Sequence, residues 1–148
     1  MNGKRVCLIH TQIVKEKSFI YKERIIESPS AAANFAAAYF IGCDKEKVYV
    51  ACIDAKGEPV SMELVSIGTS DSALIGIKEV FKAAILQNAS KIILFHVHPS
   101  GSIKPSKEDI LVTKRVKEAG TLLGIRLADH IIIGEGNSYY SFLGEETL

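Results

Sequence analysis

The sequence has no excess of charge of either sign. Its 148 residues carry 18 lysines and arginines against 17 aspartates and glutamates, which leaves a formal net charge of +1. Because a long-range attraction to nucleic acid or to an acidic membrane surface needs a charge excess, the composition excludes it as a general property of the chain. A nucleic-acid partner would have to be recognised by a local cluster.

Cysteine and long hydrophobic runs are also scarce. Cys7, Cys43 and Cys52 are an odd number, widely spaced and without a Cys-x-x-Cys pair, a pattern that favours reduced thiols over a disulfide framework. The apolar run near the N-terminus is broken at His10, too soon for a signal-peptide core. No apolar stretch approaches the ~20 residues that a membrane span needs. We therefore expect a soluble, cytoplasmic protein.

Length and composition fit one compact domain over residues 1–148. Hydrophobic residues make up 47% of the chain and charged residues 24%, which suffices to bury a core. Two β-rich runs, residues 6–14 and 18–26, flank three charged residues and predict a β-hairpin. Residues 1–27 are therefore expected to be an N-terminal hairpin extension of the domain.

Helix and strand patterns alternate through the rest of the chain. Ser28 as cap and Pro29 at the first helical position predict a helix over residues 28–41, ended by Gly42. Helical spacing of apolar residues predicts two more helices, the first of them capped by Asp71 or Ser72. The expected helices cover residues 72–87 and 106–119, and the expected strands cover residues 47–54, 58–67, 91–96, 125–133 and 138–142. This order indicates an α/β sandwich with adjacent antiparallel strands.

The expected strand over residues 91–96 is almost wholly apolar, which is typical of a buried central strand, and it ends in a pair of histidines. His96 and His98 project to the same side of a strand, within reach of one ion. Asp109 follows a segment rich in proline and glycine that suits a tight return. Two histidines, one carboxylate and an open fourth position for water make a hydrolytic zinc site, so we predict one zinc per chain on His96, His98 and Asp109.

A plainer interpretation of the same residues stays open. His96 and His98 could be ordinary strand-end residues, and Ser106 with Asp109 could be only a helix capping box. Both interpretations can hold for the turn at residues 106–109, because a helix N-terminus fixes the directions of a carboxylate and a hydroxyl.

The string His-Val-His-Pro-Ser-Gly at residues 96–101, with Pro-Ser-Lys-Glu-Asp at residues 105–109, resembles the JAMM signature of RadC-like proteins. The similarity extends from about residue 28 to residue 142. It implies a three-layer MPN domain, also called JAB, which is a cytidine-deaminase-like sandwich of a mixed sheet flanked by helices. It also implies zinc on the positions that match His96, His98 and Asp109. The superfamily includes metalloproteases that cleave ubiquitin-type isopeptide bonds, so a peptide or protein substrate is expected.

The resemblance assigns two further catalytic positions. The family mechanism needs an upstream glutamate that takes a proton from the water on the zinc and passes it to the leaving amine, and Glu46 matches it. Taken without the family, Glu46 is one acid in a run of charged residues. Ser106 matches the serine whose hydroxyl helps to stabilise the oxyanion.

The chain departs from the family pattern at three places. Val97 stands where an asparagine is usual and should point to the face opposite the metal, so it affects a loop or substrate contact at most. Gly76 and Ile77 replace a His-Pro pair, and residues 144–146 replace a Glu-Arg-Gly ending. No helix-hairpin-helix segment, the unit that often precedes this domain, is recognised.

Weaker signals leave other functions open. Asp129 and His130 could orient a metal ligand or form a structural pair, and His10 is more typical of a surface residue than of a ligand. The following basic residues form a stripe that could be solvated or could contact DNA: Lys104, Lys107, Lys114, Arg115 and Lys117. The alternatives to a zinc peptidase or isopeptidase are a non-catalytic metal-binding MPN scaffold and a DNA-associated accessory protein. The oligomeric state is not predicted.

Overall fold

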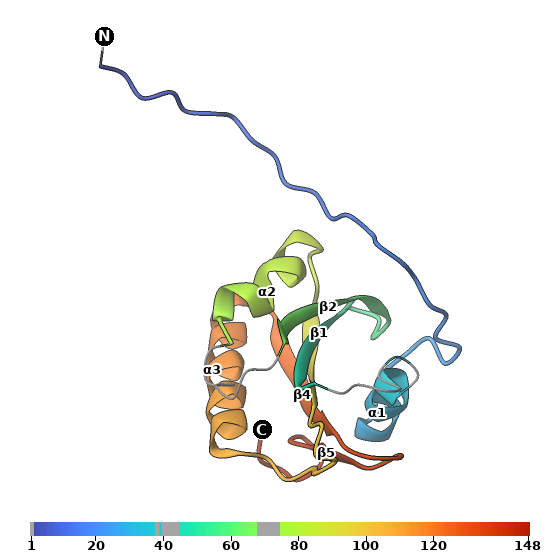
Figure 1. The fold of residues 1–148 in the computed structure, drawn as a ribbon. Helices are drawn as coiled ribbons and strands as arrows, with labels where there is room; N and C mark the ends of the chain where they lie inside the picture. The colour runs from blue at the N-terminus through green and yellow to red at the C-terminus, as the bar shows by residue number, and fades with distance from the viewer. Residues whose placement is uncertain (1, 38, 40–44, 68–74) are drawn as a thin grey trace.

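The structure is a computed structural model in which residues 2–37, 39, 45–67 and 75–148 are described. It has the predicted three layers, with α1 on one side of a five-stranded sheet and α2 and α3 on the other (Figure 1). In chain order the elements are α1 (Pro29–Ala37), β1 (Lys47–Ile53), β2 (Pro59–Ile67), α2 (Ile77–Leu86), β3 (Lys91–Val97), α3 (Lys107–Leu123), β4 (Arg126–Ile133) and β5 (Tyr139–Ser141).

The sheet is mixed and its strand order is β2-β1-β3-β4-β5. β1 pairs antiparallel with both β2 and β3, β3 pairs parallel with β4, and β4 pairs antiparallel with β5. The prediction of a central strand over residues 91–96 is therefore confirmed, and the strand extends one residue further, to Val97. With a neighbour on each side and a helix layer on each face, β3 can be apolar along its whole length.

A hydrophobic core lies on each face of the sheet, and successive side chains of β3 point alternately into one and the other. Ile92 and Leu94 belong to the core under α2 and α3, whereas Ile93, Phe95 and Val97 belong to the core under α1. His96 continues the first series, because strand side chains alternate between faces. His96, the first predicted metal ligand, therefore lies on the face of the sheet that α3 covers. Val97 lies on the opposite face, as expected.

Two helix boundaries differ from the predicted ones. Gly76 has an extended backbone (φ −73°, ψ 136°), and α2 begins only at Ile77, because glycine is a poor helix former. The predicted caps, Asp71 or Ser72, lie outside the described residues. α3 continues four residues past the predicted end at residue 119. Gly120 lies inside the helix, and only glycine fits there because a Cβ would lie 2.3 Å from the Ile125 carbonyl oxygen. The helix ends instead at Gly124, whose φ is 72°. The predicted end of the first helix at residue 41 also falls outside the described residues.

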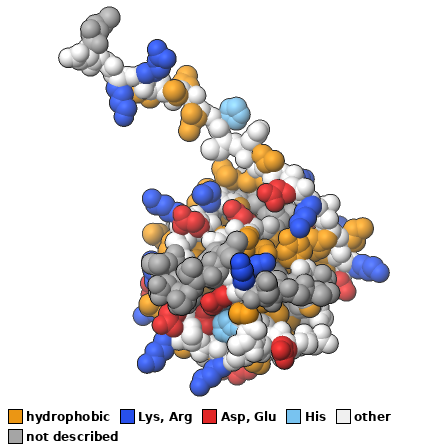
Figure 2. All heavy atoms as spheres, in the orientation of Figure 1, with side chains coloured by type: hydrophobic (Ala, Val, Ile, Leu, Met, Phe, Trp, Pro, Cys, Tyr) orange, Lys and Arg blue, Asp and Glu red, His pale blue; other side chains and the backbone are white. Residues whose placement is uncertain are grey.

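The predicted N-terminal hairpin is not formed. Residues 2–28 contain no strand, and the segment of residues 2–20 runs away from the domain (Figure 1). Its apolar side chains are exposed, among them Val6 at 82% and Ile9 at 84%, and Figure 2 shows it projecting from the body. High β propensity predicts a strand here, but a two-stranded hairpin with no core to cover is marginal in water.

Phe19 and Tyr21 attach the end of this segment to the domain, where their rings contact Phe35 of α1 at centroid distances of 5.5 and 5.2 Å.

Among the described residues, no helix is both long and apolar enough to cross a membrane.

Candidate metal centre

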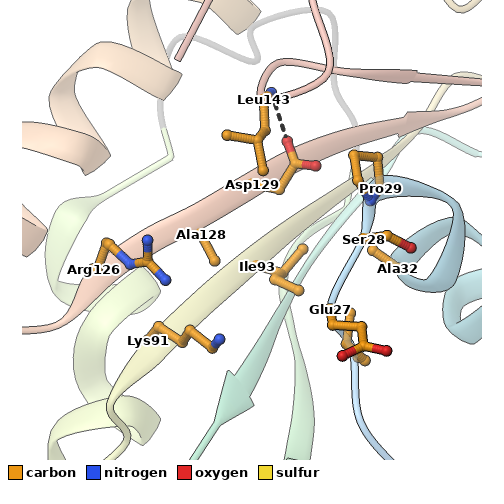
Figure 3. A pocket seen from close by; sticks show the side chains of 11 residues that line it. Glu27, Ser28, Pro29, Ala32, Lys91, Ile93, Arg126, Ala128, Asp129 and Leu143 are labelled. Carbon is orange, nitrogen blue, oxygen red and sulfur yellow. Dashed lines mark hydrogen bonds between the residues drawn. The ribbon is translucent and has the colours of Figure 1, made fainter. Parts of the chain in front are cut away.

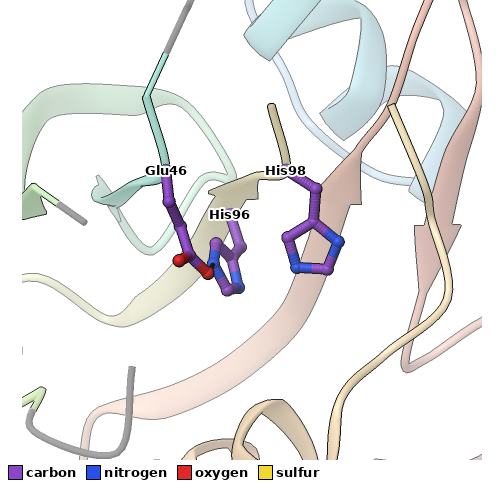
Figure 4. A group of neighbouring side chains, drawn as sticks. All are labelled: Glu46, His96 and His98. Carbon is purple, nitrogen blue, oxygen red and sulfur yellow. Dashed lines mark hydrogen bonds and ion pairs between the residues drawn. The ribbon is translucent and has the colours of Figure 1, made fainter. Parts of the chain in front are cut away.

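Three segments that are distant in sequence meet at the C-terminal end of β3. His96 and His98 lie at and just after this strand end, Asp109 lies in the first turn of α3, and Glu46 immediately precedes β1. Figure 4 shows the side chains of Glu46, His96 and His98 directed toward one another. The sequence-predicted residues are therefore brought together in one place.

The pairing register of β1 with β3 places Glu46 beside His96. β1 and β3 are antiparallel, with Val48 opposite His96 and Lys47 opposite Val97, so the residue before β1 comes to the end of β3. Glu46 Oε1 lies 2.7 Å from His96 Nε2, although fifty residues separate them. The His96 side chain is 1% exposed and that of Glu46 is 29% exposed, so the glutamate forms the solvent side of the contact.

Helix capping holds Asp109. The Ser106 hydroxyl accepts the Asp109 backbone N–H (3.0 Å), and Asp109 Oδ2 accepts the Ser106 backbone N–H (2.8 Å). The carboxylate also contacts both imidazoles, with Oδ1 2.8 Å from His96 Nδ1 and Oδ2 3.4 Å from His98 Nε2. Capping and ligand geometry thus coexist in one turn, as the sequence allowed.

The loop after β3 fixes the ring of His98. His98 Nδ1 donates to the Ser102 carbonyl oxygen (2.8 Å), because a carbonyl can only accept, so neutral His98 presents the lone pair of Nε2. The loop needs glycine at position 101, where φ is 77° and a Cβ would lie 2.6 Å from Glu135 Cγ. The Glu135 backbone N–H, in the β4–β5 turn, donates to the Gly101 carbonyl oxygen (3.5 Å), so this turn contacts the histidine loop directly.

The two imidazoles favour the charged form of the Asp109 carboxylate. Burial by itself would raise the pKa of Asp109, but the contacts with His96 and His98 outweigh it and hold the pKa well below its usual range. The same contact with Asp109 raises the pKa of His98 against the opposing effect of burial. A buried negative charge between two imidazoles suits Zn²⁺, which takes nitrogen and carboxylate oxygen ligands, so the residues present fit this metal.

Two three-residue ligand sets share the two histidines. Glu46, His96 and His98 offer donor atoms that all lie within 4.8 Å of one another. His96 faces Glu46 through Nε2 and Asp109 through Nδ1. A neutral imidazole has one nitrogen with a free lone pair, so the nitrogen that binds the ion decides which carboxylate lies beside it as a ligand. The set of His96, His98 and Asp109 stays a prediction, and Glu46 is either the base beside it or a ligand in place of Asp109.

Ser106 lies beside this centre, half-buried. Its hydroxyl oxygen caps α3, and that bond uses a lone pair and leaves the hydroxyl proton able to donate. Its predicted role toward an oxyanion therefore conflicts with none of its contacts and stays a prediction.

Asp129 and His130 do not act as a pair, because adjacent residues of β4 face opposite sides of the sheet. Asp129 accepts hydrogen bonds from the His130 N–H (2.7 Å), the Leu143 N–H (3.0 Å) and the Ser141 hydroxyl (2.6 Å). It lines a pocket between β3, β4 and the start of α1 (Figure 3). Asp129 thus attaches the C-terminal segment to the sheet.

His130 lies on the metal side. Its ring is stacked on that of His96, and Thr113 on α3 contacts its Nδ1 at 2.6 Å. Burial, together with the nearby His96, lowers the pKa of His130 to about 3, so it is neutral at physiological pH. No sequence pattern distinguishes Thr113 from any other residue of a helix.

The remaining candidates lie apart from these contacts. His10 is exposed in the N-terminal segment. The five basic residues from Lys104 to Lys117 are all exposed, and contact with DNA stays a prediction.

Comparison with known proteins shows the family of the chain. Residues 26–148 match the family described as RadC-like JAB domain. A UPF0758 protein of Caldanaerobacter subterraneus subsp. tengcongensis is 41% identical over 124 residues, covering 79% of this chain and 53% of that protein. UPF0758 proteins of Staphylococcus carnosus and Thermotoga maritima are 44% and 45% identical and are covered over 49% and 47% of their lengths, against 74% and 71% of this chain.

This chain spans about half the length of these curated relatives, whose names state no activity. The family match takes in every strand and helix of the described residues and all four residues of the candidate metal centre. The chain belongs to the RadC-like JAB domain family.

Proposed function

We propose that the chain is a zinc-dependent metallohydrolase of JAMM type that cleaves a peptide or isopeptide bond. The observation that carries the proposal is the closeness of Glu46 to His96, at 2.7 Å, between segments fifty residues apart. A structural metal site is closed by its ligands and needs no additional carboxylate at its solvent side. The free thiols of Cys7 and Cys52 suit a cytoplasmic enzyme.

His96, His98 and Asp109 would hold the zinc. When bound, zinc would supply Lewis-acid chemistry, polarising the scissile carbonyl and making water a stronger acid. His98 is prepared for this role by its bond to Ser102, which leaves Nε2 as the ligand atom. Asp109, only 2% exposed, is held by the Ser106 N–H and supplies the fixed negative charge.

Glu46 would be the general base. Its partly exposed carboxylate lies where a substrate and a water molecule can enter, in contrast to the buried Asp109. It would accept a proton from water as the water attacks the carbonyl carbon, and then donate that proton to the leaving amine. The Ser106 hydroxyl would donate a hydrogen bond to the oxyanion that forms on the carbonyl.

The Glu46→Gln variant separates zinc binding from proton transfer. The amide preserves size and removes the proton acceptor, so we expect wild-type zinc content and a turnover lower by about 10²–10⁴-fold. Zinc is measured by elemental analysis, and turnover with a fluorogenic peptide library and with ubiquitin-type isopeptide conjugates.

Two other outcomes are distinct. If Glu46→Gln loses zinc while Asp109→Asn retains it, Glu46 is the ligand and its role as base is wrong. If the zinc-loaded wild-type chain and Glu46→Gln are equally inactive on every substrate, the non-catalytic scaffold replaces the hydrolase.

A further inference from the structure

His130 is a buried imidazole with one nitrogen left over. It is 2% exposed, and its Nε2 has no hydrogen-bond partner among the described residues. An unpaired polar atom in a core opposes folding, and a phenylalanine would fill a similar volume without it. Fold stability alone therefore does not account for a histidine at this position.

The contacts of His130 lead to the metal centre along two paths. The first path is a stack of three nearly parallel rings. His130 lies 4.8 Å from Phe142 with an interplanar angle of 7°, and 6.1 Å from His96 with an angle of 13°. Offset stacking at these distances is favourable and restricts rotation of the rings. The plane of His96 is thereby set from the side of β4.

The second path is a chain of hydrogen bonds. The Thr113 hydroxyl donates to the Asp109 carbonyl oxygen (2.7 Å), which can only accept, so its single proton is used there. His130 Nδ1 must then carry the proton that it donates to Thr113 Oγ1 (2.6 Å). This assignment leaves Nε2 as a bare acceptor. It also connects His130 to the backbone of a proposed metal ligand.

We infer that His130 is a positioning residue of the metal centre, which holds the His96 ring by stacking and the Asp109 turn through Thr113. This inference rests on the proposed zinc site and deepens it. Histidine suits the position because one side chain supplies both the flat ring and the N–H donor. Outer partners of metal ligands commonly influence affinity by about 10–100-fold.

The test compares zinc affinity in three variants, with a competing chromophoric chelator as the reporter. His130→Phe keeps the ring and removes the donor, and Thr113→Val keeps the shape and removes the hydroxyl. The matched control is Thr121→Val on the same helix, whose hydroxyl also donates to the carbonyl four residues earlier, Lys117, at 3.0 Å. Thr121 is exposed and away from the centre, so the control removes the same kind of bond without touching the site.

We expect His130→Phe and Thr113→Val each to weaken zinc binding about 10–100-fold, and Thr121→Val to leave it unchanged. The visible absorption bands of the Co²⁺-substituted protein should shift in the first two variants only. Thermal unfolding of the metal-free proteins should show no loss of stability in His130→Phe, which separates a positioning role from a structural one. If His130→Phe fails to fold, Thr113→Val carries the test.

Equal zinc affinity in wild type, His130→Phe and Thr113→Val would overturn the inference while leaving the hydrolase proposal intact. A wild-type chain that binds no zinc would overturn both. A chain that binds zinc with the expected dependence on His130 and Thr113 but cleaves nothing would retain the positioning role and remove only the hydrolase.

Discussion

Asp109 and Asp129 are both buried aspartates, 2% and 3% exposed, yet their surroundings differ in kind. Asp109 meets two imidazoles, which can carry positive charge or share an ion with it. Asp129 meets two backbone N–H groups and a serine hydroxyl, all of them neutral. The two residues also lie on opposite faces of the sheet.

Their pKa values move in opposite directions. Burial raises the pKa in both cases, but at Asp109 the imidazole partners outweigh it and lower the pKa. At Asp129 the neutral donors only reduce the effect of burial, and the pKa stays raised. Partner chemistry, more than depth in the core, therefore decides whether a buried carboxylate keeps its charge for a cation or serves as a clamp.

Substitutions of Asp109 and of Asp129 should differ most in their effect on zinc affinity. Asp109→Asn should weaken zinc binding by more than the ~100-fold that the loss of an outer partner costs, because it removes a charged ligand. Asp129→Asn should bind zinc like the wild type, since it faces the other side of the sheet. Titration of both variants against a competing chelator measures this. Equal losses in the two would break the distinction between ligand and clamp.

For the free energy of unfolding, we expect the larger loss on substitution of Asp129. Asp129→Ala leaves the Ser141 hydroxyl and the His130 and Leu143 N–H groups without their acceptor. We expect a free energy of unfolding lower by about 2–4 kcal/mol, since each unpaired buried donor costs ~1–3 kcal/mol and water can reach part of this segment. Urea denaturation measures it, with Asp129→Asn as a milder control that keeps an acceptor. A loss below about 0.5 kcal/mol would mean that the clamp contributes nothing.

A smaller effect should appear in the pH dependence of unfolding of the metal-free protein. The raised pKa of Asp129 means that its contribution to stability is full below its ordinary value of 3.8 and is lost as pH rises through the folded value. Asp129→Asn should therefore gain stability relative to the wild type as pH rises.

The lowered pKa of Asp109 acts in the opposite sense. Its contribution is present above 3.8 and is lost as pH falls toward the folded value, so the deficit of Asp109→Asn should shrink in acid. Urea midpoints between about pH 3 and pH 6 would measure both trends. Parallel trends in the two variants would contradict the opposite assignments.

Local patterns predicted most of the site. The alternation of β3 places His96 and His98, and the Ser106 cap places Asp109, because both depend on residues that are neighbours in sequence. Glu46 could be found only through the family resemblance, since the pairing of β1 with β3 that brings it near is non-local. Thr113 was missed for the same reason. Its partner His130 is 17 residues away on another element.

Propensity failed where no packing supported it. Residues 6–14 have the composition of a strand but remain extended and exposed, because they cover no core. At α3, Gly120 looks like a helix end in the sequence but lies inside the helix, where it allows a close approach of Ile125. In both places the deciding contact, absent or present, lies outside the local sequence window.

The central position of β3 also bears on how the protein assembles. Its backbone is paired with β1 on one side and β4 on the other, and both pairings join segments that are distant in the chain. Amides of β3 should therefore exchange with solvent deuterium only when the whole domain opens, later than those of the edge strand β2. The four residues of the centre come together only after the slow, long-range steps of folding. A nascent chain would thus present two histidines long before it presents a complete site.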